Sequence, residues 1–167
     1  AKGHMVGTAF TIKTSAGDNL AIHEALEQIK EGDVLVIDGD GYLGRALVGE
    51  IIVNIAKSKG AAGIVVDGAI RDVAAIKADE FPCFAKGVNH KGPYKTGPGK
   101  FGVPVSVGGM VVNPGDIIVG DEDGLVVFAP EQAQFVIDAV AAQEAREAAI
   151  LKSIAEGTYT GAYGATK

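Results

Sequence analysis

The hydrophobic positions in the first part of the chain follow two periodicities in turn. Three segments are apolar at alternate positions or continuously, as strands are: residues 8–14, 34–38 and 63–68. Two segments between them carry apolar residues at helical spacing, in one Leu20, Ile22, Ala25, Leu26 and Ile29, and in the other Val48, Ile51, Ile52 and Ile55. These helices are expected to end near Gly32 and Gly60. Because strands and helices alternate along the chain, the pattern predicts an α/β fold.

The later part of the chain changes to short apolar segments separated by glycine-rich turns. These predicted strands are residues 82–85, 103–107, 110–112, 116–119 and 125–128. The turn at residues 121–124 predicts a hairpin between the last two strands, whereas the irregular stretch 92–100 predicts a surface loop. Pro130, at a first helical position, predicts a final helix, and residues 158–167 are expected to form a loose tail.

Length and composition exclude several classes of protein. A chain of 167 residues without a linker or an internal repeat is expected to form one domain over residues 1–167. Its formal net charge of −6 argues against nucleic acid as a partner, because that affinity depends mainly on neutralising phosphates. No apolar run approaches the roughly 20 residues that span a bilayer, and the start has no signal-peptide core. The single cysteine fits a reducing compartment, so we expect a cytoplasmic protein that binds neither nucleic acid nor membrane.

The glycine loop at residues 39–44 has the G-x-G-x-x-G spacing of a dinucleotide site. It follows a predicted strand and is expected to open the second helix, and Asp67 ends the next strand where a ribose-binding acid would lie. Against this, Asp38 and Asp40 would place two negative charges beside a pyrophosphate that needs positive potential. The loop is therefore interpreted as a tight turn, with a nicotinamide-dependent enzyme as the alternative.

A second candidate is the pair Arg71-Asp72, which follows the third apolar strand. In open α/β sheets, ligands bind beyond the carboxyl ends of the strands. The guanidinium of Arg71 suits a carboxylate, and the carboxylate of Asp72 suits Mg²⁺. Because adjacent side chains alternate in direction, we expect one to point towards a substrate and the other towards a metal. Alternatively, the two form a surface ion pair worth at most about 1 kcal/mol.

Glu50, near the start of the second predicted helix, provides the context for this pair. On a regular helix it is turned about 160° from the apolar stripe. It is therefore expected to face the strand ends where Arg71 and Asp72 lie. Gly49 lets the backbone approach a ligand closely, and free amide groups at a helix start hold anions. The alternative is a solvated glutamate without a role in binding.

The other polar residues form no recognisable site. His4, His23 and His90 are too widely spaced for a metal-ligand pattern, and His23 is expected to be a packed or solvated helix residue. No helical lysine stands out as the desolvated amine that Schiff-base chemistry needs. Tyr94 and Lys95 lie in the long irregular stretch, where a bare surface loop is expected rather than a cover for a site.

Glu50, twenty intervening residues and then Arg71-Asp72 resemble the acidic-x20-Arg-Asp motif of the 4-hydroxy-4-methyl-2-oxoglutarate aldolase family, also called the RraA-like family. The similarity extends over about residues 6 to 150 and includes the stretches 6–11, 17–20, 66–72, 103–109, 114–116 and 121–126. Glu50 is one methylene longer than the aspartate often found at this position. The resemblance implies a layered α/β sandwich related to the swivelling phosphohistidine domain. It also implies a homotrimer or a dimer of trimers, with active sites between subunits.

The resemblance further implies a role for each matching residue. Asp72 would bind a divalent metal, Mg²⁺ or Mn²⁺, directly, and Glu50 would hold a water on that metal. Arg71 would contact the keto-acid end of the substrate, while the backbone amides of Gly49, Glu50 and Ile51 would bind its carboxylate. The implied reaction is metal-dependent retro-aldol cleavage of 4-hydroxy-2-oxo acids to pyruvate. Decarboxylation of oxaloacetate is expected as a side activity, because it passes through the same enolate.

Two further expectations come from the same family. A neighbouring subunit is expected to contribute another acidic side chain, for which Glu144 and Glu147 in the last helix are the candidates. The family also contains the inhibitor of an RNA-degrading endonuclease, so a non-catalytic binding protein is the main alternative function. In that branch the acid after the arginine is typically absent. Asp72 therefore favours the lyase.

Overall fold

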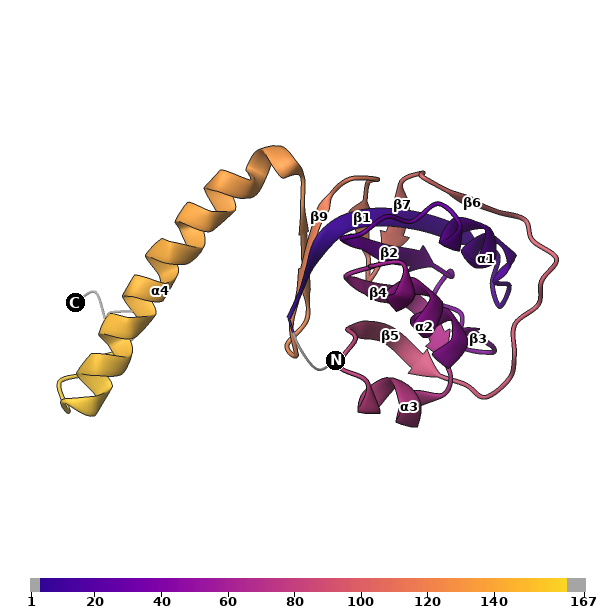
Figure 1. Ribbon diagram of the computed structural model, residues 1–167. Coiled ribbons are helices and arrows are strands. Elements are labelled where there is room, and N and C mark those ends of the chain that lie inside the picture. The colour runs from indigo at the N-terminus through magenta and orange to yellow at the C-terminus, as the bar shows by residue number, and fades with distance from the viewer. Residues whose placement is uncertain (1–3, 162–167) are drawn as a thin grey trace. The chain divides into compact units, whose positions relative to one another are not determined.

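The computed structural model describes residues 4–161, whose elements are labelled in Figure 1. The chain divides into two compact units, Ala1–Ala129 and Pro130–Lys167. Within residues 4–161, all strands belong to the first unit, and the second contains one long helix. Residues 158–161 of the predicted tail have no regular secondary structure, and residues 162–167 lie outside the described residues.

A mixed eight-stranded sheet forms the centre of the first unit. The strands β1 (Met5–Thr14), β2 (Asp33–Asp38) and β4 (Gly63–Ile70) pair in parallel, as expected for strands joined by helices. Beyond β1 the sheet continues with β9 (Ile117–Gly120) and β10 (Leu125–Phe128), which are antiparallel neighbours. The predicted hairpin between these last two strands is thereby confirmed.

Strand β4 changes its neighbour along its length. Asp67 is its last residue paired with β2, and Ala69 and Ile70 then pair with the short strand β3 (Ala46–Val48). On its other edge β4 pairs in parallel with β5 (Cys83–Val88). The carboxyl ends of β3, β4 and β5 therefore lie side by side at one edge of the sheet.

Three short strands complete the first unit. Strand β6 (Gly99–Phe101) pairs with the end of β1, antiparallel to it. Strands β7 (Val105–Val107) and β8 (Met110–Val112) form a separate two-stranded sheet. The irregular segment between β5 and β6 corresponds to most of the predicted surface loop.

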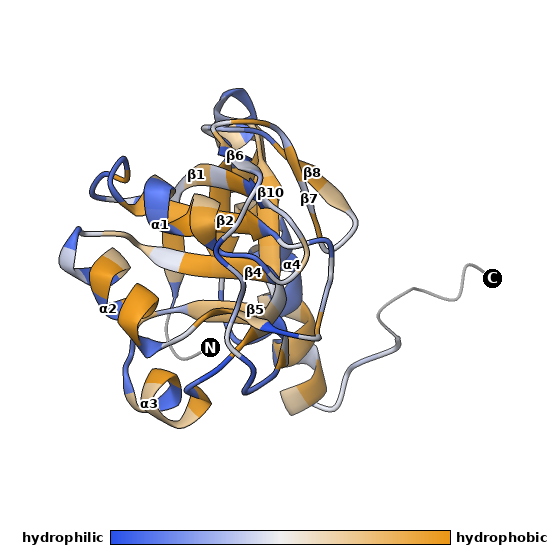
Figure 2. Ribbon diagram, turned by 90° about the vertical axis from the view of Figure 1, so that its right-hand side faces the viewer, coloured by the Kyte–Doolittle hydropathy of each residue, from blue (hydrophilic) through white to orange (hydrophobic). Residues whose placement is uncertain are grey.

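Both faces of the main sheet are covered, as the continuous apolar run of β2 predicts. Leu35 and Ile37 belong to one buried cluster, which includes residues of α1 (Leu20–Leu26) and α2 (Glu50–Ser58). The alternate residues Val34 and Val36 belong to a second cluster, which includes Val105, Val112 and Ile118. In Figure 2 the central strands are largely orange between these layers. The predicted α/β class is confirmed.

The predicted helices differ from the observed ones in their boundaries. Helix α1 ends at Leu26, not near Gly32. Helix α2 begins only at Glu50, because Val48 belongs to β3, a strand too short to show a periodicity of its own. Ile51, predicted for the apolar face of α2, is 69% exposed, since the buried residues of this helix are Ile52, Val53 and Ala56. A third helix, α3 (Val73–Ala78), was not predicted.

The second unit consists of a 3₁₀ turn, η1 (Pro130–Gln132), followed by the 23-residue helix α4 (Ala133–Ala155). The final helix predicted from Pro130 is confirmed. None of the residues of α4 is buried, although several are large and apolar: Phe135, Ile137, Val140, Leu151 and Ile154. Among the described helices, none is long and apolar enough to cross a membrane.

Candidate active site

The carboxyl ends of β3 and β4 bring Glu50 and the pair Arg71-Asp72 together. Glu50 opens α2 two residues after β3 ends, and Arg71 follows the last residue of β4. The backbone amide of Arg71 donates to the carbonyl of Val48 at 3.0 Å, which extends the pairing of the two strands beyond their ends. The amide of Glu50 donates to Oδ2 of Asp72 at 3.0 Å. The three residues of the motif are therefore neighbours in space.

Asp72 has an unusual backbone conformation for a residue other than glycine. Its φ of 59° and ψ of 34° lie in the left-handed region, where it precedes α3. Such a conformation is costly for most residues and occurs preferentially at functional sites. It also overturns the expectation that the two adjacent side chains point in different directions, because the alternation holds only for extended backbone. Arg71 Nε instead lies 3.7 Å from Asp72 Oδ2, and both side chains are 41% exposed.

Gly49 makes this arrangement possible because it lacks a side chain. A Cβ atom at this position would lie 2.5 Å from Oδ2 of Asp72 and 3.1 Å from Nε of Arg71. The group that lies close to the backbone at Gly49 is therefore the Arg71–Asp72 pair of the chain itself, whereas a ligand was expected there. The amide of Glu50, expected to hold a substrate carboxylate, is occupied by Asp72 in this conformation.

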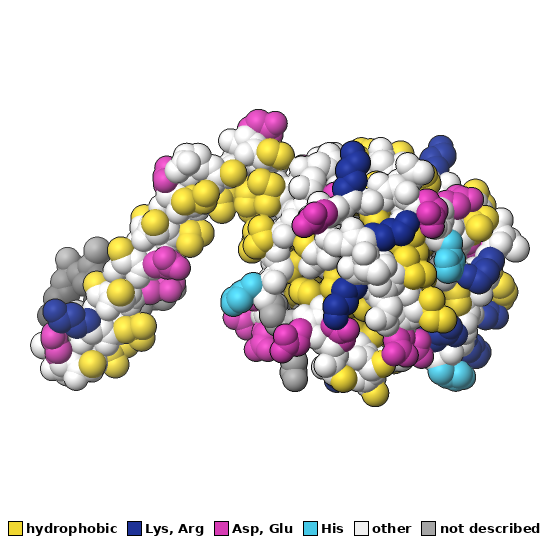
Figure 3. All heavy atoms as spheres, viewed as in Figure 1, with side chains coloured by type: hydrophobic (Ala, Val, Ile, Leu, Met, Phe, Trp, Pro, Cys, Tyr) yellow, Lys and Arg dark blue, Asp and Glu magenta, His cyan; other side chains and the backbone are white. Residues whose placement is uncertain are grey.

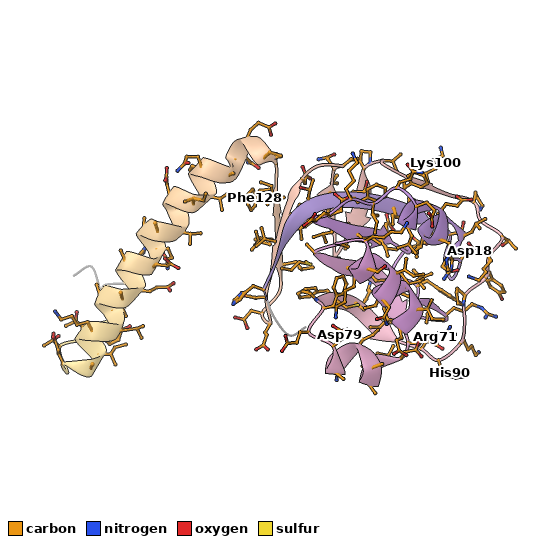
Figure 4. The ribbon with its side chains drawn as sticks, viewed as in Figure 1. Asp18, Arg71, Asp79, His90, Lys100 and Phe128 are labelled. Atoms are coloured by element: carbon orange, nitrogen blue, oxygen red, sulfur yellow. The ribbon has the colours of Figure 1, made fainter. Side chains whose placement is uncertain are left out.

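A cleft of about 240 Å³ opens beside this pair. Its lining includes Gly49, Ile51, Arg71 and Asp72, together with Asn19, His23 and Lys95. We call it the Arg71 cleft. In Figure 4, Arg71 lies near the strand ends at the right of the first unit. Figure 3 shows basic side chains and histidines gathered on this part of the surface. The exposure of the apolar side chain of Ile51 is consistent with its place in the lining of this cleft.

Lys95, which was expected to lie in a bare surface loop rather than over a site, lines the cleft. Its Nζ lies 2.7 Å from Nε2 of His23 and donates to Oδ1 of Asn19 at 3.2 Å. Burial lowers the pKa of His23, and the positive charge of Lys95 lowers it further. The ring is therefore neutral at pH 7 and accepts a hydrogen bond from the ammonium. Among residues 4–161, Lys95 forms no ion pair, so its charge is open to an anion.

The carboxylates at the cleft fit a hard divalent cation that keeps most of its water. Asp72 lines the cleft, and Glu50 is the exposed residue between its lining residues Gly49 and Ile51. No three His, Cys, Asp or Glu side chains among the described residues form a closed metal cage. Mg²⁺ is commonly held by one or two carboxylates, with waters and substrate oxygens completing its shell. Asp72 as a direct ligand and Glu50 through water match that preference, whereas a closed Zn²⁺ site does not.

The glycine loop at residues 39–44 does not have the surroundings of a dinucleotide site. It leads into strand β3 rather than into a helix, so no helix N-terminus faces a pyrophosphate. A Cβ atom at Gly39 would collide with Leu47, and one at Gly44 with Tyr42. The glycines therefore make room for the chain's own side chains. The expectation that this loop opens the second helix was wrong, and the tight-turn interpretation agrees with the structure.

Comparison with known proteins identifies the family. The model of the RraA-like family, described as Aldolase/RraA, matches residues 1–127. A protein of Halalkalibacterium halodurans, provisionally named 4-hydroxy-4-methyl-2-oxoglutarate aldolase, is 44% identical over 154 residues, which are 90% of this chain and 73% of that protein.

Two similar solved structures carry the name of an RNA-processing regulator. The RNA-processing inhibitor RraA from Thermus thermophilus has a TM-score of 0.72 and 34% identity, covering 77% of each chain. An unusual member of the RNase ES inhibitor RraA family from Streptomyces coelicolor has a TM-score of 0.79 and 33% identity, covering 87% of this chain and 75% of that one. The chain belongs to the RraA-like family.

Proposed function

We propose that the protein is a divalent-metal-dependent lyase that cleaves 4-hydroxy-2-oxo acids, of the 4-hydroxy-4-methyl-2-oxoglutarate type, to pyruvate. The observation that carries the proposal is that Arg71 and Asp72, with Glu50 hydrogen-bonded beside them, share one cleft with Lys95. Among the described residues, the ammonium of Lys95 has no acidic partner. The provisional aldolase name of the Halalkalibacterium relative supports the same class of reaction.

Substrate binding follows from the charges of the cleft. Arg71 presents a planar set of donors suited to a carboxylate, and Lys95 adds a second positive charge to the lining of the same cleft. Exposed Asp72 and Glu50 would hold Mg²⁺ or Mn²⁺, with Glu50 acting through a water. When bound, the cation supplies Lewis acidity toward the keto-acid oxygens. The cleft thus suits a small acid with neighbouring carboxylate and carbonyl groups.

The cleavage breaks the C3–C4 bond of the substrate. Its electron pair moves to the C2 carbonyl, forming an enolate, while the proton of the 4-hydroxyl leaves and C4 becomes a carbonyl carbon. Protonation of the enolate at C3 then gives pyruvate. The guanidinium of Arg71 would stabilise the developing negative charge, which is the kind of interaction that lowers a barrier by several kcal/mol. His23 already accepts a hydrogen bond from Lys95, so we assign the proton transfer to a water molecule.

The assembly we propose is a homotrimer or a dimer of trimers, with a site completed by a neighbouring subunit. Helix α4 carries exposed apolar residues and no buried one, although a helix normally gains most of its stability from packing its apolar face. Its carboxylates Glu144 and Glu147 are the candidates to supply a further acid to the Arg71 cleft of another copy.

The test is pyruvate release from 4-hydroxy-4-methyl-2-oxoglutarate, followed through lactate dehydrogenase, with and without EDTA. We expect turnover to stop with the chelator and to return with Mg²⁺ or Mn²⁺. Asp72→Asn should lower kcat/KM by about 100-fold or more, because it removes the proposed metal ligand. Asp79→Asn, at the other end of α3 and outside the Arg71 cleft, is the matched control and should stay near wild type. Undiminished turnover in EDTA would refute the metal role.

A second candidate function is non-catalytic binding of a ribonuclease. The similar Thermus and Streptomyces structures, both named for RraA, favour it. The discriminating measurement is a pull-down with a purified RNase E-type nuclease, using wild type and Asp72→Ala. Strong capture that Asp72→Ala retains, in a protein that releases no pyruvate, would favour this function over the lyase.

A further inference from the structure

The segment of residues 92–97, which we call the strap, is tied to the turn that precedes α1. Tyr94 donates its amide to the carbonyl of Gly17 at 2.8 Å, and Asn19 donates its own to the carbonyl of Tyr94 at 3.0 Å. The two segments are therefore paired in parallel at this point, as a short bridge between Asp18 and Tyr94. The strap is thus a fixed part of the fold, where a bare loop was expected.

The carboxylate of Asp18 holds the strap immediately after Lys95. Its Oδ2 accepts from the amide of Thr96 at 2.6 Å, from the amide of Gly97 at 3.0 Å and from the hydroxyl of Thr96 at 3.1 Å. Its Oδ1 accepts from the amide of Leu20 at 2.9 Å, at the start of α1. Asp18 is only 2% exposed. Among the residues that the structure describes, it forms no ion pair.

A buried charge without a counter-ion must be balanced by hydrogen bonds. Here four donors balance it, and three of them belong to the strap. An amide in place of the carboxylate would turn an N–H towards at least one of these donors. All three strap donors share Oδ2, and the amide of Leu20 uses Oδ1. A side-chain amide has one uncharged oxygen, which can face the strap or α1 but not both and accepts more weakly than a carboxylate. A carboxylate at position 18 is therefore required because it holds the strap and α1 together.

The residue between these two attachments is Lys95. Tyr94 is tied by its backbone and Thr96 by Asp18, so the backbone of Lys95 is held on both sides. Its ammonium reaches Asn19 and His23 in the Arg71 cleft. Asn19 in turn donates its side-chain amide to the carbonyl of Leu47 in β3 at 3.0 Å. A chain of contacts thus links the buried carboxylate to the cation that faces the ligand.

Arg45 contacts the part of the strap that precedes Lys95. Its guanidinium donates to the carbonyl of Gly92 at 2.6 Å and to the hydroxyl of Tyr94 at 2.9 Å, and lies 3.9 Å from the centre of the Tyr94 ring. These contacts all precede Lys95. Among the side chains of residues 4–161, that of Asp18 holds the two strap residues after Lys95, Thr96 and Gly97, and the hydroxyl of Ser15 donates to the carbonyl of the next residue, Pro98, at 2.8 Å.

We propose that Asp18 is a positioning residue, which acts through the strap to hold the ammonium of Lys95 in the Arg71 cleft. The role rests on the proposed function in one respect only, that the ligand of the cleft is a keto acid. Asp18 itself touches no ligand. Its loss is therefore expected to weaken binding of the acid and raise KM, while kcat changes little.

The test compares Asp18→Asn, Lys95→Met and the double variant, with oxalate and Mg²⁺ as the probe in titration calorimetry. Lys95→Met should weaken oxalate binding about tenfold, the size expected for one charge-assisted contact. Asp18→Asn should approach this loss, and the double variant should bind no more weakly than Lys95→Met. Additive losses would overturn the proposal, because Asp18 would then act independently of Lys95.

Hydrogen exchange provides a second readout that needs no ligand. Asp18→Asn should speed exchange of the Thr96 and Gly97 amides at least tenfold, while the central strands stay protected. The control is Asp116→Asn, since Asp116 is also buried and accepts the amide of Asn113 in another turn, away from the cleft. It should change neither strap exchange nor oxalate affinity. Unchanged exchange in a folded Asp18→Asn protein would refute the proposal.

The two readouts separate failure of this proposal from failure of the proposed function. A wild-type protein that binds no oxalate would refute the keto-acid site, and with it the role of Asp18 in binding, while exchange would still decide whether Asp18 holds the strap. If Asp18→Asn does not fold, Asp18→Glu keeps the charge and displaces it by one methylene. Its loss of oxalate affinity must again vanish in the Lys95→Met background, or the proposal fails.

Discussion

Gly49→Ala is the sharpest perturbation of the candidate site that leaves its charges in place. The backbone at Gly49, with φ of −143° and ψ of −173°, is extended and open to any residue. The new methyl group would nevertheless lie 2.5 Å from Oδ2 of Asp72 and 3.1 Å from Nε of Arg71. Since carbon and oxygen normally stay more than 3 Å apart, the carboxylate must move by roughly 1 Å.

The magnitudes separate activity from stability. Moving the carboxylate breaks the hydrogen bond from the Glu50 amide, which is worth about 1 kcal/mol. Replacing glycine by alanine in an allowed conformation stabilises the folded state by about 0.4–1 kcal/mol, because alanine lowers the conformational entropy of the unfolded chain. The free energy of unfolding should therefore change by less than about 1 kcal/mol. A displacement of about 1 Å at a reacting centre costs about 100-fold in rate, so kcat/KM should fall by that factor.

The assay is pyruvate release at saturating Mg²⁺, together with urea unfolding of the same preparations. The matched background is Asp72→Ala, in which the added methyl meets no carboxylate. There Gly49→Ala should no longer disturb a hydrogen bond and should stabilise the fold slightly. Wild-type turnover in Gly49→Ala would refute the reasoning, since Asp72 would then have tolerated the displacement or have had no role. A large loss of stability would show that Gly49 serves the fold instead.

Two further predictions concern charged groups away from Gly49. Lys95→Met should raise KM for 4-hydroxy-4-methyl-2-oxoglutarate about tenfold with little change in kcat, and an unchanged KM would remove Lys95 from the binding site. Burial raises the pKa of Asp38, but hydrogen bonds from Lys13, Ser106 and Asp40 outweigh it and lower the pKa below its usual value. Its stabilising effect is therefore present above about pH 3.9 and is lost as the pH falls through the lowered folded-state value. Urea unfolding between about pH 5 and pH 2.5 should show a weaker acid loss in Asp38→Asn than in wild type, and equal losses would contradict the assignment.

The candidate site could be located from the sequence because its three residues depend on local rules. Arg71 and Asp72 follow a continuous apolar strand, and Glu50 opens a helix after another strand. Parallel strands end at the same edge of a sheet, so these side chains were expected to meet. The prediction that the side chains of Arg71 and Asp72 point in different directions was wrong. Asp72 has a left-handed backbone, and its carboxylate packs closely against Gly49 and the amide of Glu50. Such contacts between distant segments are not visible in the sequence.

What the sequence determined by itself was the alternation of strands and helices, the hairpin near its end and the edge where the charged motif lies. Each depends on side-chain period or on residues close in the chain. Only the tertiary structure decided that Lys95 lines the same cleft as Arg71, since its contacts to Asn19 and His23 span 76 and 72 residues. The side chain of Lys95 makes those contacts from a strap that is held by backbone hydrogen bonds, by Arg45 and by the buried carboxylate of Asp18. The spacing of residue types along the chain does not predict these contacts, because they depend on where distant backbone amides lie after folding.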